Sequence, residues 1–182
     1  MEKSIFIEEA IKLGASKAIA ISTADIVFDP RCRLKCIVPL CPNYRKNLMC
    51  PPFLPPFNEA KEMIQKYRWG ILVIVETPVS QEKDKIETGS LKVYKIVSEL
   101  EKAAFNKGYR FAAGFTSDSC KLCDKCVIAE KNDTTCRHPL QARPSMQAMG
   151  IDVTATLEKV VTSSLEFPPK EKIMWVGMVL IE

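Results

Sequence analysis

The residues with the clearest chemistry are three cysteines in the run Cys120-Lys-Leu-Cys123-Asp-Lys-Cys126, followed by Cys136. Within the run, two residues separate each cysteine from the next, the spacing by which ferredoxin-like chains wrap an iron–sulfur cluster. Thiolates prefer soft metals, and evenly spaced cysteines surround one compact centre more readily than a zinc ion, whose sites usually come as two separated pairs. The run therefore predicts a metal protein.

The remaining cysteines form an earlier group. This first group is Cys32, Cys36, Cys41 and Cys50, and the second group is Cys120, Cys123, Cys126 and Cys136. Eight cysteines in two groups of four match two four-thiolate metal centres and leave no cysteine over. The first group fits no standard ferredoxin or zinc-finger spacing, so it supports a site more weakly. We expect two [4Fe–4S] clusters as cofactors, with zinc as the alternative.

Length and composition favour one domain without disulfide bonds. The chain has 182 residues, of which 47% are hydrophobic, so it can bury a core without covalent staples. Residues 1–9 include acidic side chains where a signal peptide needs an apolar stretch, and no segment approaches the roughly 18 apolar residues of a membrane span. We therefore expect a single domain over residues 1–182 that is cytoplasmic, does not contact a membrane and keeps its thiols reduced.

The charge of the chain argues against a nucleic-acid partner. The formal charge of +4 counts each cysteine as neutral, yet four thiolates around a cluster or a zinc ion leave about −2 per site. Two filled sites would bring the total near zero, and the charged residues are interspersed. Arg31, Arg33 and Lys35 lie among the first cysteines; they fit a solvated or cluster-neutralising surface, or alternatively a docking patch for an acidic partner.

The N-terminal part of the chain predicts a helix and then a strand. Apolar residues at helical spacing run from Ile5 to Leu13, and Gly14 ends the pattern. Residues 18–22 are a short run of alanine and β-branched residues that predicts a strand, with residues 26–28 as its continuation.

The first cysteine group lies in an expected loop over residues 30–57. Six prolines from Pro39 to Pro56 exclude regular helix and interior strand there, so a metal clip must supply the order. The alternative is a proline-rich surface loop with incidental cysteines. The second cysteine group occupies another expected loop, residues 118–139.

The middle of the chain alternates helix and strand. Asn58 is expected to cap a helix, and the apolar run of residues 69–76 predicts a central strand. The order of helix and then strand suggests a crossover connection. Apolar residues at helical spacing predict a helix near residues 84–107, followed by a strand over residues 109–115.

The C-terminal part repeats this alternation. Pro144 suits the first position of a short helix that Gly150 ends, Asp152 opens another helix, and residues 173–181 predict the last strand. The sequence thus predicts an α/β fold, a small sheet of about four strands flanked by helices, with two cysteine-rich metal-binding loops inserted where strands end.

Taken together, several motifs resemble an uncharacterised family of predicted metal-binding, cysteine-rich proteins of anaerobes. The motifs are the triple-cysteine run, Cys50-Pro51-Pro52, Cys136-Arg137-His138-Pro139, Arg143-Pro144-Ser145-Met146 and Gly150-Ile151-Asp152-Val153. The resemblance spans nearly the whole chain. It implies a cytosolic metal-binding protein and no established reaction.

The resemblance also bears on the first site. It centres that site on Cys36, Cys41 and Cys50 and implies that Cys32 is peculiar to this chain. If Cys32 is not a ligand, the site has three thiolates and an open position, which lets a metal or cluster bind substrate directly. Gln147 stands where the family pattern carries an acidic residue, which weakens an acid–base role there.

Three functions are compatible with these residues. The first is a relay in which two iron–sulfur clusters pass electrons to a redox partner protein. The second is a cluster-dependent reductase or sulfur-handling enzyme, in which Arg143 and His138 are candidates for holding a small anionic substrate, although each residue also fits a structural role. The third is an interaction domain stapled by structural zinc. The relay is the favoured hypothesis.

Overall fold

Four antiparallel strands form the sheet of this computed structural model, which describes residues 2–79, 83–161 and 165–182. The strands, in the order in which they pair, are β1 (Lys17–Ser22), β2 (Trp69–Pro78), β4 (Lys172–Leu180) and β3 (Ala113–Phe115). The two long strands pair from Gly70 with Leu180 to Pro78 with Lys172. Because every neighbouring pair is antiparallel, the predicted crossover is wrong, whereas the prediction of a small four-stranded α/β domain is confirmed.

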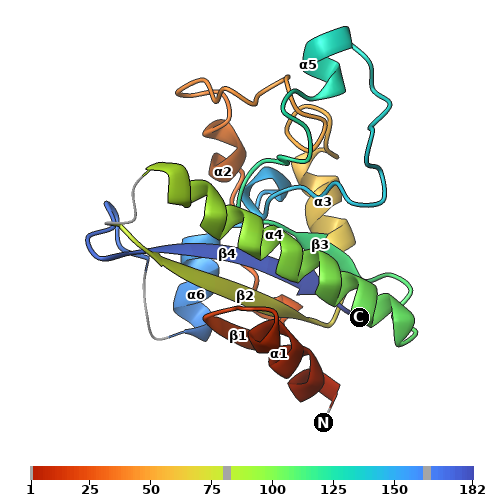
Figure 1. The fold of residues 1–182 in the computed structure, drawn as a ribbon. Helices are drawn as coiled ribbons and strands as arrows, with labels where there is room; N and C mark the ends of the chain where they lie inside the picture. Colours follow the sequence, from red (N-terminus) through yellow and green to blue (C-terminus); the bar gives the residue numbers. More distant parts are fainter. Residues whose placement is uncertain (1, 80–82, 162–164) are drawn as a thin grey trace.

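Helices cover both faces of the sheet (Figure 1). On one face, α1 (Glu2–Lys12) and α4 (Lys83–Asn106) pack over the side chains that β2 sends to that side, such as Ile71 and Val73. On the other face, the cover is α3 (Phe57–Ile64), α6 (Val153–Val160) and the 3₁₀ helix η2 (Gln147–Met149). Because β2 and β4 are covered on both sides, their apolar runs are nearly continuous, as in a central strand.

Helix α4 confirms its predicted core face. Val93, Ile96, Leu100 and Ala104 are fully buried at the spacing of one helical face, and Gly108 follows the helix with a positive φ of 99°. Helix α6 is also confirmed, because the side chain of its N-cap, Asp152, accepts a hydrogen bond from the backbone N–H of Ala155 at 3.0 Å.

Other predicted details differ in the structure. Residues 26–28 do not continue β1, because the 3₁₀ helix η1 (Thr23–Asp25) turns the chain out of the sheet. The N-cap of α3 is Pro56 and not Asn58. Pro144 begins no helix, since its carbonyl accepts a hydrogen bond from the backbone N–H of Thr116 and holds the segment extended. In α1, Phe6 and Ala10 face the core while Ile5 and Ile11 are exposed.

The two cysteine segments stand together above α4, on the side of the sheet where β3 forms the edge (Figure 1). The first segment contains a single helical turn, α2 (Arg31–Leu34), where no regular helix was expected, and the second contains α5 (Val127–Lys131). None of the helices in the described parts of the chain is long and apolar enough to cross a membrane.

Candidate metal centre

The four cysteines of the second group line a hollow of about 600 Å³. Cys120 follows the edge strand β3 by a short turn in which the Thr116 hydroxyl donates to the carbonyl of Asp118 at 2.9 Å. Cys126 is the N-cap residue of α5, and Cys136 returns the chain to the same hollow. The structure thus gathers all four predicted ligands of the second group around one space.

Donors surround the sulfur atoms of this group. The backbone N–H of His138 donates to the Sγ atom of Cys136 at 3.3 Å. The guanidinium of Arg137 lies against the thiol of Cys123 and pairs with the carboxylate of Glu130. Hydrogen bonds to sulfur stabilise the thiolate form, which is the form that binds metals.

Burial opposes the thiolate form when no metal is bound. It raises the pKa of Cys120, and the neighbouring charges of Cys136, Cys123 and Cys126 raise it further. Four thiolates in one hollow repel one another, so only a bound cation can offset their charge. This is the electrostatic setting of a thiolate metal site.

Three cysteines of the first group also lie close together. The backbone N–H of Cys41 donates to the carbonyl of Cys36 at 3.0 Å. Burial, followed by the charges of Cys41 and Cys36, raises the pKa of Cys50 to about 12. The structure therefore gathers Cys36, Cys41 and Cys50, the three positions on which the family resemblance centres the first site.

Cys32 has different surroundings. It lies one helical turn before Cys36, and burial raises the pKa of its thiol to about 11. The charged groups that act most strongly on this thiol are the carboxylates of Asp152 and Asp29, and not other cysteines. A carboxylate disfavours a nearby thiolate, so the surroundings of Cys32 support its role as a ligand less than those of the other three cysteines.

The segment from Pro144 to Asp152 brings the two cysteine segments together. On one side, its Gly150 carbonyl accepts from the Asp29 backbone N–H at 2.9 Å, immediately before the first cysteine. On the other side, Met146 donates its backbone N–H to the carbonyl of Thr116 at 3.0 Å, immediately before the second group. Motifs in the family resemblance that carry no ligand thus form a brace between the two segments.

The two cysteine segments also contact each other directly. The side-chain amide of Asn47 donates to the carbonyl of Cys120 at 2.8 Å, and that of Asn43 donates to the hydroxyl of Ser119 at 3.1 Å. Asn47 is only 6% exposed. Sequence reasoning missed both asparagines, because their spacing has no relation to the cysteines that they bring together.

Arg143 is a structural clamp in this fold. Its Nε atom donates to the carboxylate of Glu101 on α4 at 2.7 Å, and its Nη atoms donate to the same carboxylate and to the carbonyls of Ala142 and Leu140. Glu101 in turn accepts from the backbone N–H of Gly114 in β3 at 2.6 Å. The donors of Arg143 are therefore engaged inside the protein, which removes the reason to assign it to substrate.

The basic residues of the first segment do not form one patch. Arg33 donates to the carbonyl of Pro55 at 2.8 Å and so anchors its own loop. Arg31 pairs with Asp29, although its side chain is otherwise exposed. Lys35 is exposed to solvent. Two of the three cations are thus engaged within the segment, so the run is mostly structural and charge-neutralising.

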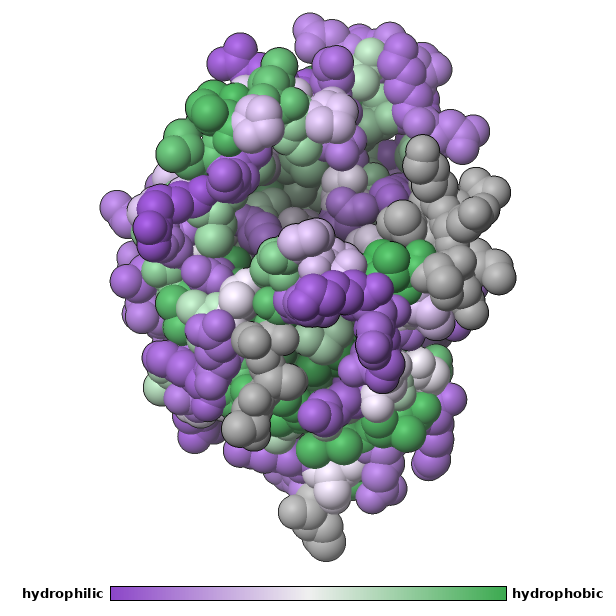
Figure 2. Space-filling model, turned by 90° about the vertical axis from the view of Figure 1, so that its left-hand side faces the viewer, coloured by the Kyte–Doolittle hydropathy of each residue, from purple (hydrophilic) through white to green (hydrophobic). Residues whose placement is uncertain are grey.

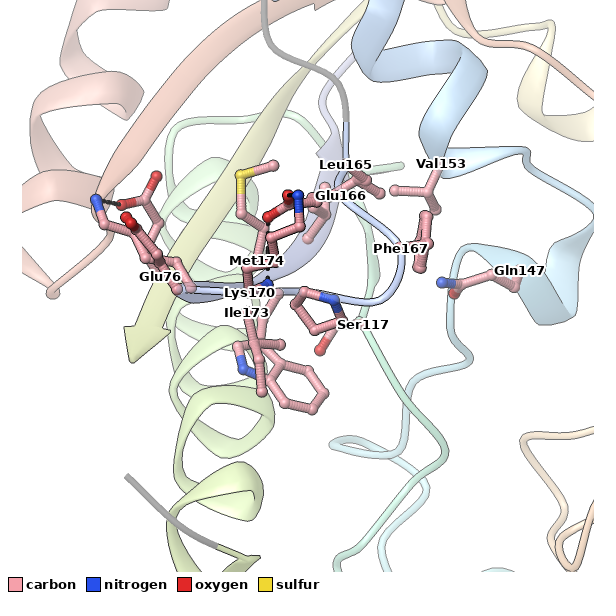
Figure 3. Close-up of a pocket in the computed structure, with 15 residues that line it drawn as sticks. Glu76, Ser117, Gln147, Val153, Leu165, Glu166, Phe167, Lys170, Ile173 and Met174 are labelled. Atoms are coloured by element: carbon pink, nitrogen blue, oxygen red, sulfur yellow. Dashed lines mark hydrogen bonds and ion pairs between the residues drawn. The ribbon is translucent and has the colours of Figure 1, made fainter. Parts of the chain in front are cut away.

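A second hollow, of about 740 Å³, contains no cysteine. It lies at the start of β4, where Lys170 pairs with Glu166 at 2.9 Å and Lys172 pairs with Glu76 at 2.8 Å (Figure 3). Gln147 points toward it from η2 (Figure 3). Because its lysines are already neutralised by carboxylates, this hollow is poorly suited to a small anionic substrate.

The donor set fits a soft metal or a metal cluster. Each group offers thiols with nearby N–H donors or other thiols, and all eight cysteines are free of disulfide bonds. Across residues 2–79, 83–161 and 165–182, however, no three His, Cys, Asp or Glu side chains are arranged to hold a single metal ion. The four cysteines of the second group line one hollow, whereas those of the first group line none of the hollows described above.

Comparison with known proteins gives one match. No curated protein and no solved structure matches the chain. A family model described as predicted metal-binding protein (DUF2284) matches residues 19–181, which include the sheet except for the first two residues of β1, the brace and both cysteine groups. The chain therefore belongs to this family of predicted metal-binding proteins.

Proposed function

We propose that this protein is an iron–sulfur protein that carries two [4Fe–4S] clusters and transfers electrons to, or within, a redox assembly. The observation that carries the proposal is the hollow of about 600 Å³ around which the fold gathers Cys120, Cys123, Cys126 and Cys136. A bound cluster supplies a site that accepts and returns one electron.

The spacing of the second group favours a cluster over zinc, because Cys120, Cys123 and Cys126 form one evenly spaced run, whereas zinc ligands usually come as two separated pairs. A zinc ion binds sulfur at about 2.3 Å, which draws its four sulfur atoms to within about 4 Å of one another. A four-iron cluster is a larger body and holds its cysteines farther apart.

The protein residues would hold and tune each centre. The second group provides four thiolates, while Cys36, Cys41 and Cys50 provide three at the first centre and Cys32 is the candidate for the fourth. Around the second centre, the N–H of His138 and the guanidinium of Arg137 stabilise negative charge on sulfur. Such hydrogen bonds favour the reduced, more negative state and raise the reduction potential.

The surface beside the first centre suits a redox partner protein. Apolar side chains gather at the top of the face in Figure 2, above a hollow. In the segment that carries the first cysteines, Val38 is 61% and Leu40 is 70% exposed, and the cationic side chains of Lys35 and Arg45 are exposed nearby in the sequence. We therefore propose a partner whose docking face has an apolar centre with acidic residues around it.

A cluster-dependent reductase is the second candidate. The hollow of the second group is lined by Lys46, Lys125 and His138 as well as by its cysteines. These side chains are cations or potential cations, and they could hold a small anionic substrate beside the centre. This candidate requires substrate turnover, whereas the relay requires only electron exchange with a protein.

The metal content separates an iron–sulfur protein from a zinc-stapled one. We would purify the protein without oxygen, measure iron, zinc and acid-labile sulfide, and record visible absorption and electron paramagnetic resonance before and after dithionite. The proposal expects about eight irons and eight sulfides per chain and colour that bleaches on reduction. Two zinc ions without colour would contradict it and identify a stapled interaction domain.

A further inference from the structure

One buried side chain joins the two cysteine segments. The amide nitrogen of Asn47 donates to the carbonyl oxygen of Cys120 at 2.8 Å, which fixes the backbone of the first residue in the second group. Asn47 is 6% exposed, so this bond is shielded from water. A buried amide that lost this partner would keep an unsatisfied donor, which is costly.

The same residue organises its own segment. Its side-chain oxygen accepts the backbone N–H of Met49 at 2.9 Å, and its carbonyl accepts the backbone N–H of Cys50 at 3.0 Å. Asn47 therefore fixes the backbone on both sides of the junction, at Cys50 in the first group and at Cys120 in the second.

The first segment also forms part of the wall of the second hollow. Pro42, Asn43, Asn47 and Met49 line the same space as the four cysteines of the second group. Asn43 adds a second direct contact through the hydroxyl of Ser119, at 3.1 Å. The space around the second centre is thus complete only when the first segment is in place.

We propose that the two metal centres are thermodynamically coupled through Asn47, so that filling either centre strengthens metal binding at the other. The proposal rests on the proposed function only in that both cysteine groups bind metal. Metal binding orders its own loop, and Asn47 transmits that order to the facing loop. The second binding event then has less chain entropy to lose, which is positive cooperativity.

The coupling is reciprocal, because it is an equilibrium property of two linked sites. Typical couplings change affinity by about 5- to 150-fold, and we expect about tenfold for a junction that depends on the buried hydrogen bond of Asn47. Two independent centres would bind metal with the same affinity whether or not the other centre is filled, so their coupling factor would be one.

Cadmium titration of matched variants measures this factor. Cd²⁺ binds thiolates with an ultraviolet charge-transfer band, so it probes both centres whether the native group is a cluster or zinc. The variant C120S/C123S leaves the first centre alone, and C36S/C41S leaves the second alone. By competition with a chelator, each isolated centre should bind Cd²⁺ about tenfold more weakly than the same centre in the natural chain. Equal affinities would overturn the proposal.

The variant Asn47→Asp tests the route of the coupling. It keeps the acceptor for Met49 but loses the donor to Cys120, so the tenfold factor should fall to about one when the titrations are repeated in this background. Asn58→Asp, an exposed residue on α3, is the matched control and should keep the factor. A merely structural role for Asn47 would weaken both centres and leave the factor unchanged, which would overturn the assignment.

A third variant guards against misfolding, and metal analysis separates the two proposals. If Asn47→Asp does not fold, as judged by circular dichroism, Asn47→Ala removes the same donor to Cys120 without adding a charge; a factor near one supports the proposal and an unchanged factor overturns it. Coupled Cd²⁺ binding in a protein without iron and sulfide would overturn the proposed function alone. An iron–sulfur protein with a coupling factor of one would overturn this inference alone.

Discussion

The two cysteine groups have the same number of thiols but different construction. The second group surrounds one hollow from a compact stretch of sequence, with N–H donors close to its sulfur atoms. The first group contains no such closely spaced run; its close members are Cys36, Cys41 and Cys50, while the charges nearest the buried thiol of Cys32 are carboxylates.

This difference teaches where local sequence suffices for a metal site. Thiols separated by two residues must lie near one another, because the chain between them is too short to separate them. Thiols separated by eight residues, such as Cys41 and Cys50, can lie far apart, so packing against the rest of the protein decides their positions. The run from Cys120 to Cys126 therefore depends mainly on its own segment, whereas Cys136, which nine residues separate from Cys126, and the first group depend on packing against the rest of the protein.

Replacement of a thiol in each group should have the largest effect. Cys123→Ser should remove roughly half of the bound metal, because the second centre loses a ligand in the middle of its run. Cys41→Ser should remove the other half. Iron and sulfide per chain, measured after anaerobic purification, check both variants. If either variant retained the full content, the two groups would not be the two ligand sets.

Cys32 and Cys36 provide a sharper test within the first group. Cys36→Ser should weaken metal binding at the first centre by more than about 100-fold, whereas Cys32→Ser should weaken it by no more than about 10- to 100-fold, the range of a residue that only supports a site. Competition with a chelator in the C120S/C123S background measures both. Equal losses would make Cys32 a ligand and the two groups alike.

The clamp between Arg143 and Glu101 supports mainly the second segment. Arg143→Ala should lower the free energy of unfolding by about 2 kcal/mol, because the partly buried carboxylate of Glu101 loses its partner. Urea denaturation of the metal-free protein measures this change, with Lys102→Ala on the exposed side of α4 as the control. No loss of stability would mean that the pair is not the anchor of this region.

The smallest expected effect is on stability at alkaline pH, which should decrease in the metal-free protein and not in the metal-loaded protein. Burial raises the pKa of Cys32 to about 11 and that of Cys50 to about 12, so the folded chain retains protons that the unfolded chain releases. The stability from these thiols is complete below the ordinary thiol pKa and is lost as the pH rises toward these values.

The metal-free protein should therefore unfold at a lower urea concentration at about pH 10.5 than at about pH 8. Cys50→Ala should reduce this dependence, and the metal-loaded protein should lack it because its thiolates are already formed. If the urea midpoints of the metal-free natural protein and of metal-free Cys50→Ala changed equally with pH, the thiol of Cys50 would not be the origin of this dependence.

Some of the fold followed directly from local patterns. The helical spacing of Val93, Ile96 and Leu100 identified the buried face of α4, and the continuous apolar run of β2 identified a central strand. These predictions succeeded because burial of apolar surface is the main driving force of folding and leaves a periodic trace in the sequence.

The direction of the strands did not follow from those patterns. The order of helix and strand suggested a crossover into β2, yet β1 and β2 are antiparallel neighbours, whereas α4 connects the parallel strands β2 and β3, which both pair antiparallel with β4. A strand that is buried on both faces has the same apolar pattern in either direction. Only the three-dimensional packing of the helices decides how the chain returns to the sheet.

By itself, the sequence determined the class of chemistry, because soft thiol ligands and their short spacing specify a metal site whatever the fold. The tertiary structure decided which thiols meet and that the two segments share a wall. Asn47, Arg143 and the brace from Pro144 to Asp152 act through contacts between residues distant in the chain. Such contacts leave no periodic or short-range pattern, because they depend on the path of the whole backbone.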